Sequence, residues 1–262
     1  MNGRNWLRIV CVGGLMMLAA AAAMAFGGKR VAPVVEAKVL NTFDHDAGSF
    51  VQGLAIEDGQ MWEGSGQYGY SSLRKVDFET GRIQNSVPLG KDYFGEGITL
   101  LRGKIYQLTW RENVCFVYDQ KTLQRIGAFK YTGEGWGLAN DGTNLYLSDG
   151  SLQIRVIEPE KFTVVRKFNV QLANRKDYRL NELEMVNGEL WANVWYSDKI
   201  ARIAPATGEV VGWLDASQLW PQNDRPSREH VLNGIAFDSS SNKLYLTGKN
   251  WPKLFEIALP SK

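Results

Sequence analysis

The chain has 262 residues, and its 30 lysines and arginines nearly balance its 28 aspartates and glutamates, so the formal net charge is only +2. A nearly neutral chain offers no basic surface for nucleic acid or anionic lipid. The chain also contains only two histidines and two cysteines, which argues against a zinc site built from these residue types. Any catalysis is therefore expected to use carboxylates, amides, lysines or aromatic side chains.

The N-terminal segment has the pattern of a secretory signal peptide. Arg4 and Arg8 precede an apolar run that begins at Ile9, and Ala23-Met24-Ala25 resembles a cleavage site. We therefore assign residues 1–25 to a signal peptide and expect an exported protein, periplasmic or secreted. A retained membrane anchor is the alternative, because the apolar run of about 17 residues is at the short limit for a spanning helix.

Cleavage after this segment changes both the cysteine count and the charge. Cys11 is lost with the signal peptide, so Cys115 remains as a single cysteine and no internal disulfide can form. Loss of Arg4 and Arg8 brings the formal charge from +2 to zero. The remaining chain is long enough to bury a core that needs no covalent links.

Residues 31–262 consist of short runs in which apolar and polar residues alternate, separated by Gly, Asn and Asp turns, which predicts an all-β fold. One unit occurs five times, as "QGLAIEDGQMWEGSG", "EGITLLRGKIYQLTW", "WGLANDGTNLYLSDG", "NELEMVNGELWANVW" and "NGIAFDSSSNKLYLTGK". The units start 44, 40, 45 and 52 residues apart, which is the period of a propeller blade. The sequence therefore predicts a five-bladed β-propeller of four-stranded antiparallel blades.

The end of the chain is one strand short of a complete last blade, because only "LFEIAL" follows the fifth unit. The run "VVEAKVLNTF", before the first unit, is predicted to supply the missing strand and close the ring. The longer fourth spacing comes from an insertion, "DASQLWPQNDRPSREHV", which we expect to hold one helical turn and to lie over a face of the ring.

Equivalent positions at one end of the innermost strands converge on the axis of a propeller. A glycine follows the first residue of four units, which lets the backbones approach each other or a ligand; the fourth unit has Glu182 there. Glu96 stands between two glycines, where a packing role is hard to see, so we interpret it as a placed functional group. The first residues of the units are Gln52, Glu96, Trp136, Asn181 and Asn233.

A second set of positions is predicted at the same mouth, where the second strand of each unit ends. Phe50 and Phe94, two residues before Gln52 and Glu96, extend the set. Together these side chains form the mixed apolar and polar cup that is typical of a small-ligand site. The second set consists of Gly66, Trp110, Gly150, Trp195 and Lys249.

Structural roles are an alternative for several of these residues. Each tryptophan could simply pack between blades, and the amides of Gln52, Asn181 and Asn233 could bond to open backbone groups where blades meet. Lys249 is harder to explain in this way, because a lysine that faces a channel needs a partner or a ligand.

Seven stretches, in this order, closely resemble the glutamine cyclotransferase family, the plant and bacterial type of glutaminyl-peptide cyclotransferase. They are "FVQGL", "YFGEGIT", "YQLTW", "GEGWGLANDG", "LNELE", "ANVWYSD" and "LTGKNWP". The resemblance extends from about Val34 to Ile257. It implies a five-bladed propeller, which agrees with the repeat, and an aminoacyltransferase that converts N-terminal glutamine of peptides or proteins into pyroglutamate with release of ammonia.

The resemblance also implies that these residues form the site and that Glu96 moves the proton, and we infer how the other roles are divided among them. Glu96 would be the general acid and base that moves a proton from the attacking amine to the departing nitrogen, with its pKa raised by an apolar environment. Gln52 and Asn181 would hydrogen-bond the substrate, and Lys249 would polarise its carbonyl group. The walls that exclude water would be formed by Phe50, Phe94, Trp110, Trp136 and Trp195.

No cofactor is expected, although a structural calcium in the central channel is known in the family. The expected partners are peptides or proteins with N-terminal glutamine, with no nucleic acid and no membrane after signal cleavage, and a closed ring without strand edges predicts a monomer. The alternative function is a non-catalytic exported propeller that binds peptide termini or saccharides. A metal-dependent propeller hydrolase is disfavoured, because it would need several channel carboxylates.

Overall fold

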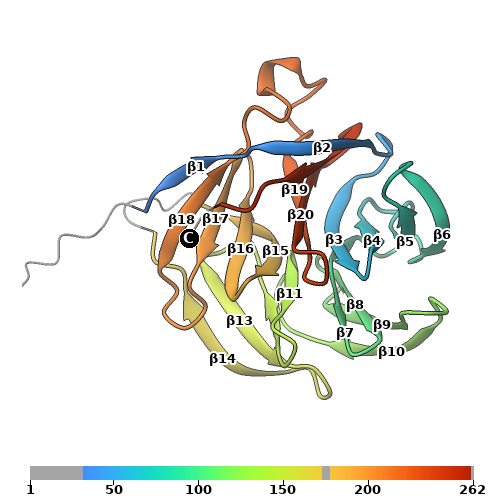
Figure 1. Cartoon of the computed structure of the whole chain (residues 1–262). Helices are drawn as coiled ribbons and strands as arrows, with labels where there is room; N and C mark the ends of the chain where they lie inside the picture. Colours follow the sequence, from blue (N-terminus) through green and yellow to red (C-terminus); the bar gives the residue numbers. More distant parts are fainter. Residues whose placement is uncertain (1–31, 173–177, 261–262) are drawn as a thin grey trace, which may run out of the picture. The chain divides into compact units, whose positions relative to one another are not determined.

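The computed structural model describes residues 32–172 and 178–260, which form 21 strands and one short helical turn. The predicted signal peptide, residues 1–25, lies outside the described residues. In the described ranges no helix has the length and apolar character that a membrane crossing requires. The strands are arranged as five sheets around a central axis (Figure 1), which confirms the predicted five-bladed propeller.

Each of the first three blades is a sheet of four consecutive antiparallel strands. The first blade contains β3 (Val51–Glu57), β4 (Gln60–Ser65), β5 (Ser72–Asp77) and β6 (Arg82–Pro88). The second contains β7 (Gly95–Leu101), β8 (Lys104–Thr109), β9 (Val114–Asp119) and β10 (Arg125–Lys130). The third contains β11 (Leu138–Asn140), β12 (Leu145–Leu147), β13 (Gln153–Glu158) and β14 (Thr163–Asn169).

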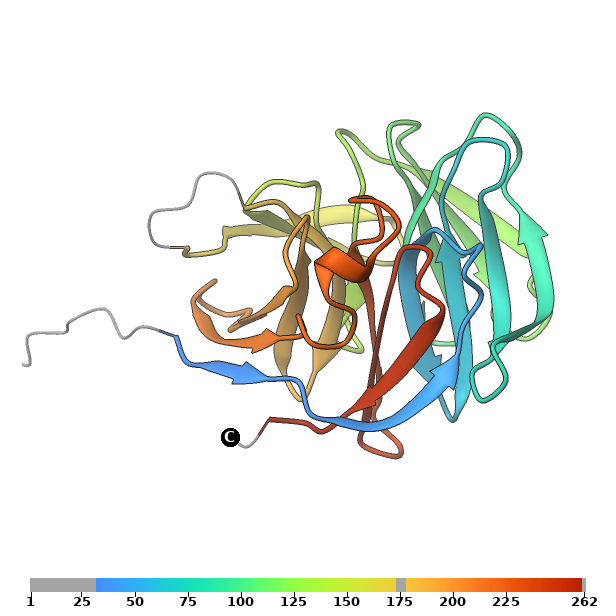
Figure 2. The ribbon, with the colours of Figure 1, turned by 90° about the horizontal axis from the view of Figure 1, so that it is seen from above.

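The last two blades use strands from the N-terminal segment. The fourth blade has β15 (Leu180–Val186), β16 (Glu189–Val194), β17 (Lys199–Ile203) and β18 (Val210–Asp215), and β1 (Val34–Glu36) adds a parallel strand beside β18. The fifth has β19 (Leu232–Asp238), β20 (Lys243–Gly248) and β21 (Lys253–Ile257), completed by β2 (Val39–Asp44). Figure 2 shows β1 and β2 as consecutive blue strands beside these two blades.

The predicted closure of the ring is therefore confirmed for β2, which pairs antiparallel with β21. The structure adds one feature that the sequence did not reveal: the run before the first unit divides in two, and β1 joins the neighbouring blade instead. One blade thus has five strands rather than four. The N-terminal segment ties the fourth and fifth blades together, so both depend on it for their outer edges.

The innermost strands β3, β7, β11, β15 and β19 contact one another in ring order. Glycine makes this close approach possible: a Cβ on Gly97 would lie 2.6 Å from the backbone nitrogen of Leu138. A Cβ on Gly137 would lie 2.1 Å from the backbone oxygen of Asn181. The prediction that these glycines let the backbones crowd at the axis is confirmed.

The fourth blade has Glu182 where the other blades have glycine, and the Glu182 side chain forms hydrogen bonds to neighbouring blades. The carboxylate of Glu182 is fully buried and accepts the backbone amides of Leu54 at 3.4 Å and Ile235 at 3.0 Å. It thereby joins strands of three blades where the other units bring backbones together directly.

The insertion before β19 contains one 3-10 turn, Gln222–Asp224, as predicted. It packs against loops of the fourth and fifth blades: Arg225 Nη2 lies 2.7 Å from Asp198 Oδ1, and the rings of Trp220 and Trp251 are 5.7 Å apart. Asp198 belongs to the β16–β17 loop, which also carries Trp195. The insertion therefore supports one side of the channel mouth at which the predicted site lies.

Candidate active site

A β-bulge recurs near the start of the innermost strand in four blades. The register of β3 on β4, β7 on β8, β15 on β16 and β19 on β20 shifts at this point. A bulge turns the extra residue out of the regular pleat and re-aims its side chain. The residues in these bulges include Gln52, Glu96, Asn181 and Asn233, which are four of the five predicted first positions.

Most of the predicted second set lies at the same mouth. In four blades the residue that follows the second strand donates its backbone N–H to a backbone oxygen just before the innermost strand's first position. These bonds, all 2.8–2.9 Å long, run from Gly66 to Phe50, Trp110 to Phe94, Trp195 to Arg179 and Lys249 to Val231. Gly150 lies three residues after β12 and packs under Trp136, since a Cβ there would be 2.6 Å from the indole ring. The two sets therefore share one end of the channel.

Glu96 is the central carboxyl group of this mouth. Only 4% of the residue is exposed, and Gln52 Nε2 donates to Glu96 Oε1 at 3.2 Å. Asn233 Nδ2 in turn donates to Gln52 Oε1 at 3.3 Å, which fixes the orientation of the Gln52 amide. Burial raises the pKa of Glu96 well above its usual range, although the charge of Lys249 opposes this shift. Burial thus favours the protonated carboxyl and Lys249 the carboxylate, the two forms between which an acid–base group alternates.

Lys249 is the cation of the site. It is 5% exposed, and its Nζ lies 4.7 Å from the centre of the Phe50 ring. Burial lowers its pKa to about 8, while the charges of Glu96 and Glu229 act in the opposite direction. A buried ammonium over an aromatic ring has given up most of its water, so it is available to an anionic or carbonyl oxygen.

Aromatic rings form the wall of the mouth. The rings of Phe50 and Phe94 are 6.3 Å apart and those of Phe94 and Trp110 are 5.6 Å apart. On the other side, Trp136 and Trp195 meet edge to face at 5.5 Å. All five rings are partly exposed rather than buried.

Asn181 carries a hydrogen-bonding group without a partner. Its residue is 2% exposed, and its Oδ1 accepts no hydrogen bond from the described part of the chain. Buried polar atoms are normally paired. A donor on a ligand could pair with this acceptor.

Sequence reasoning missed Glu134, which contacts two of the predicted tryptophans. Its Oε2 accepts the indole N–H of Trp110 and of Trp136, each at 2.9 Å. A signal was present: Glu134 stands two residues before a first position, as Phe50 and Phe94 do. Glu112 was missed as well; its carboxylate accepts the backbone N–H of Phe94 at 3.2 Å.

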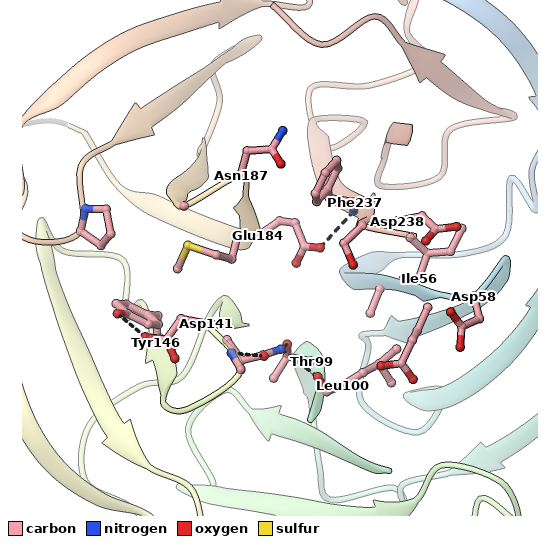
Figure 3. Close-up of a pocket in the computed structure, with 18 residues that line it drawn as sticks. Ile56, Asp58, Thr99, Leu100, Asp141, Tyr146, Glu184, Asn187, Phe237 and Asp238 are labelled. Atoms are coloured by element: carbon pink, nitrogen blue, oxygen red, sulfur yellow. Dashed lines mark hydrogen bonds between the residues drawn. The ribbon is translucent and has the colours of Figure 1, made fainter. Parts of the chain in front are cut away.

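The opposite mouth of the channel contains an open pocket of about 650 Å³. Figure 3 shows Glu184 directed into it beside Phe237, whose backbone N–H donates to Glu184 Oε1 at 3.0 Å. Burial raises the pKa of Glu184 to about 8. The residues that line this pocket include neither lysine nor arginine and none of the predicted site residues. It therefore lacks the pairing of a buried carboxyl with a buried cation that marks the other mouth.

A structural calcium in the channel stays a possibility that the resemblance implies, since calcium can also bind backbone and amide oxygens. The described residues contain no group of three or more His, Cys, Asp or Glu side chains arranged to hold a metal ion. The buried Glu182 uses its two oxygens for backbone amides.

Comparisons with known proteins agree with the five-bladed fold. The model of the glutamine cyclotransferase family matches residues 9–259. The chain is 42% identical over 228 residues to a glutaminyl-peptide cyclotransferase of Arabidopsis thaliana, covering 86% of this chain and 71% of that protein. The crystal structure of Myxococcus xanthus glutaminyl cyclase superposes with a TM-score of 0.81 at 35% identity, covering 87% of this chain and 98% of that one.

Proposed function

The chain belongs to the glutamine cyclotransferase family, and from that premise we propose that it is a glutaminyl-peptide cyclotransferase. It converts the N-terminal glutamine of a peptide or protein into pyroglutamate and releases ammonia. The observation that carries the proposal is Glu96, a buried carboxyl group with a raised pKa at an aromatic mouth.

The reaction needs proton transfer and no other reactant. The α-amine nitrogen forms a bond to the side-chain carbonyl carbon, and the bond from this carbon to the side-chain nitrogen breaks. One proton must leave the attacking amine and one must reach the departing nitrogen, which leaves as ammonia. A single carboxyl group that alternates between base and acid can carry out both transfers.

Glu96 has the properties that this role requires. Burial raises its pKa and so favours the protonated form that a general acid needs, while the charge of Lys249 favours the ionised form that a general base needs. Within the described residues its Oε1 accepts the Gln52 amide and its Oε2 accepts no hydrogen bond, so one oxygen is available to the substrate amine. The Gln52 amide holds the carboxylate in place without adding a charge.

Lys249 and Asn181 complement Glu96. The buried ammonium of Lys249 is suited to stabilise the oxyanion that forms when the amine attacks the amide carbonyl. The unpaired Oδ1 of Asn181 is suited to accept an N–H of the substrate amine or carboxamide. These contacts would hold the glutamine folded on itself, which gives the proximity that ring closure requires.

The aromatic wall favours ring closure over hydrolysis. The two groups of rings, Phe50, Phe94 and Trp110 and then Trp136 and Trp195, would exclude water from a bound glutamine side chain. Proton transfer by Glu96 and oxyanion stabilisation by Lys249 account for the chemistry, so we propose that the reaction needs no metal ion.

The test is release of ammonia from a short peptide with N-terminal glutamine, with and without a chelator. We expect wild-type release to resist the chelator and Glu96→Gln to reduce kcat about 10²–10⁴-fold. Glu184→Gln is the matched control, because burial also raises the pKa of the Glu184 carboxyl, which lies at the opposite mouth. Folded wild-type protein that releases no ammonia would move the chain to the class of non-catalytic binding propellers.

A further inference from the structure

The carboxylate of Glu134 lies between the two halves of the aromatic wall. It belongs to the loop between β10 and β11. Its Oε2 accepts the indole N–H groups of Trp110, from the second blade, and Trp136, from the third, at 2.9 Å each. Its Oε1 accepts Arg111 Nε at 3.2 Å. One side chain therefore fixes the orientation of two indoles from different blades.

Without Glu134 the wall consists of two separate groups of rings. Phe50, Phe94 and Trp110 form one chain of edge-to-face contacts. The other group contains Trp136 and Trp195, 5.5 Å apart. Among the described residues no ring contact joins the two groups, so the shared carboxylate sets the spacing between the Trp110 and Trp136 indole nitrogens.

The backbone of this loop is anchored as well. Gly135 N donates to the backbone oxygen of Trp110 at 3.0 Å. The backbone oxygen of Glu134 accepts Arg155 Nη2 at 2.7 Å. Arg111 also stacks on the Trp110 indole, with its guanidinium carbon 3.6 Å from the ring centre. The position of the carboxylate is therefore set by the fold and not by a free side-chain rotation.

Glu134 also carries a charge that reaches Glu96. Partial burial favours the neutral form of Glu134, but hydrogen bonds from Trp136, Trp110 and Arg111 outweigh this and lower its pKa, so it remains ionised. Its negative charge contributes to the raised pKa of Glu96.

The other charged and titratable groups around Glu96 are few. Lys249 acts in the opposite direction to Glu134, and Glu112 acts in the same direction. The phenols of Tyr68 and Tyr131 also interact with the Glu96 charge and have raised pKa values themselves, so they are neutral at physiological pH.

We propose that Glu134 is a positioning residue of this site, which holds the indoles of Trp110 and Trp136 in one wall and places a fixed negative charge within Coulombic reach of Glu96. The inference rests on the proposed function. Glu134 touches no reacting atom; it acts through the indoles, which contact the substrate, and through Glu96, which moves the proton.

Two variants separate the two roles. Glu134→Gln keeps a carbonyl oxygen that can accept both indole N–H groups, as Oε2 does now, but it removes the charge. Glu134→Ala removes the hydrogen bonds as well. Glu189→Gln is the matched control: the Glu189 carboxylate bonds the Trp191 indole at 3.2 Å and Arg202 at 2.8 Å, at the far end of the fourth blade.

The experiment measures kcat and KM for ammonia release against pH for the wild type and these variants. Loss of a negative charge lowers the pKa of Glu96, so we expect the acidic limb of the kcat/KM profile to move to lower pH in both Glu134 variants. We expect KM to stay near the wild-type value in Glu134→Gln and kcat/KM to fall about 10–100-fold in Glu134→Ala, as misplacement of binding groups typically produces. The profile of Glu189→Gln should coincide with that of the wild type.

The outcomes distinguish the two proposals. If the wild type releases ammonia and the Glu134→Gln profile coincides with it, the charge role is wrong while the proposed function stands. If Glu134→Ala is folded and as active as Glu134→Gln, the indole role is wrong. If the folded wild type releases no ammonia, the proposed function fails and the role of Glu134 fails with it.

Discussion

A buried cluster around Glu63 is expected to hold the ring closed. His45 follows β2, and its Nε2 lies 2.8 Å from Glu63 Oε2 while its Nδ1 lies 2.7 Å from the backbone oxygen of Trp251. The hydroxyl of Ser49 donates to Glu63 Oε1, and Arg74 Nη1 lies 3.4 Å from the same oxygen. The cluster therefore connects the N-terminal closing strand with the first and fifth blades.

Replacing Glu63 by alanine removes the acceptor that these groups share. The side chains of His45 and Glu63 are only 3% and 2% exposed, so water cannot replace the lost carboxylate. Removing one partner of a buried ion pair costs about 3–5 kcal/mol of unfolding free energy. In a protein of this size each kcal/mol lowers Tm by about 2–4 °C, so we expect a decrease of about 6–20 °C.

The difference between wild type and Glu63→Ala should depend on pH. Burial alone would lower the pKa of His45, but the hydrogen bond and charge of Glu63 outweigh burial and raise this pKa above 6.5. The contribution of His45 to the free energy of unfolding is therefore complete below pH 6.5 and is lost as pH rises through the folded-state pKa. Burial alone would raise the pKa of Glu63, but His45, Ser49 and Arg74 lower it below 4.5; its contribution is complete above 4.5 and is lost as pH falls through the folded-state value. The difference is therefore largest between about pH 4.5 and 6.5.

Thermal unfolding followed by circular dichroism across this range tests the prediction, with Glu79→Ala as a control because Glu79 is exposed. Glu79→Ala should change Tm by little at any pH, since surface substitutions are usually worth less than about 0.5 kcal/mol. A Tm difference for Glu63→Ala that is the same at every pH, or no larger than that of the control, would refute the assigned pairing.

Two further predictions concern the axis and the site. Gly97→Ala should lower the free energy of unfolding in urea by about 2–4 kcal/mol, because the added methyl would meet the backbone of Leu138 and Trp136 at 2.6 Å. Gly127→Ala is the control: the nearest neighbour of its added methyl lies at 4.0 Å, so it should change this free energy by less than about 1 kcal/mol. Equal effects of the two substitutions would contradict the close approach of the backbones at Gly97. Lys249→Met should reduce kcat about 10²–10³-fold and move the acidic limb of the pH profile upward, since it removes the cation that lowers the pKa of Glu96; a limb that moves downward would show that Lys249 does not act on this carboxyl.

The overall fold could be predicted because the repeat has a physical cause. Every innermost strand must approach its neighbours closely, so a glycine recurs at Gly53, Gly97 and Gly137 and marks the period of the blades. Glu96 could be located for the same reason, since it stands beside one of these glycines. The exception at Glu182 became understandable only from the structure, where its carboxylate bonds backbone amides of two other blades.

The features that the sequence did not reveal depend on contacts between different strands or blades. The bulges at Gln52 and Glu96 are shifts in the pairing of two strands, so the sequence of one strand does not reveal them. The pairing of β1 with β18 joins residues almost 180 positions apart with three exposed residues, too short a run to identify. The role of Glu134 depends on its position between two indoles from different blades, which the structure shows.

The central claim is that Glu96 carries out the proton transfer in a site that other residues form. The most direct test measures binding and turnover of the same glutamine-initiated peptide by wild type and Glu96→Gln. We predict that the variant binds the peptide with a Kd within about threefold of the wild-type value while its kcat falls at least about 10²-fold. Turnover by Glu96→Gln close to that of the wild type would contradict the account, because the proton would then be moved by another group.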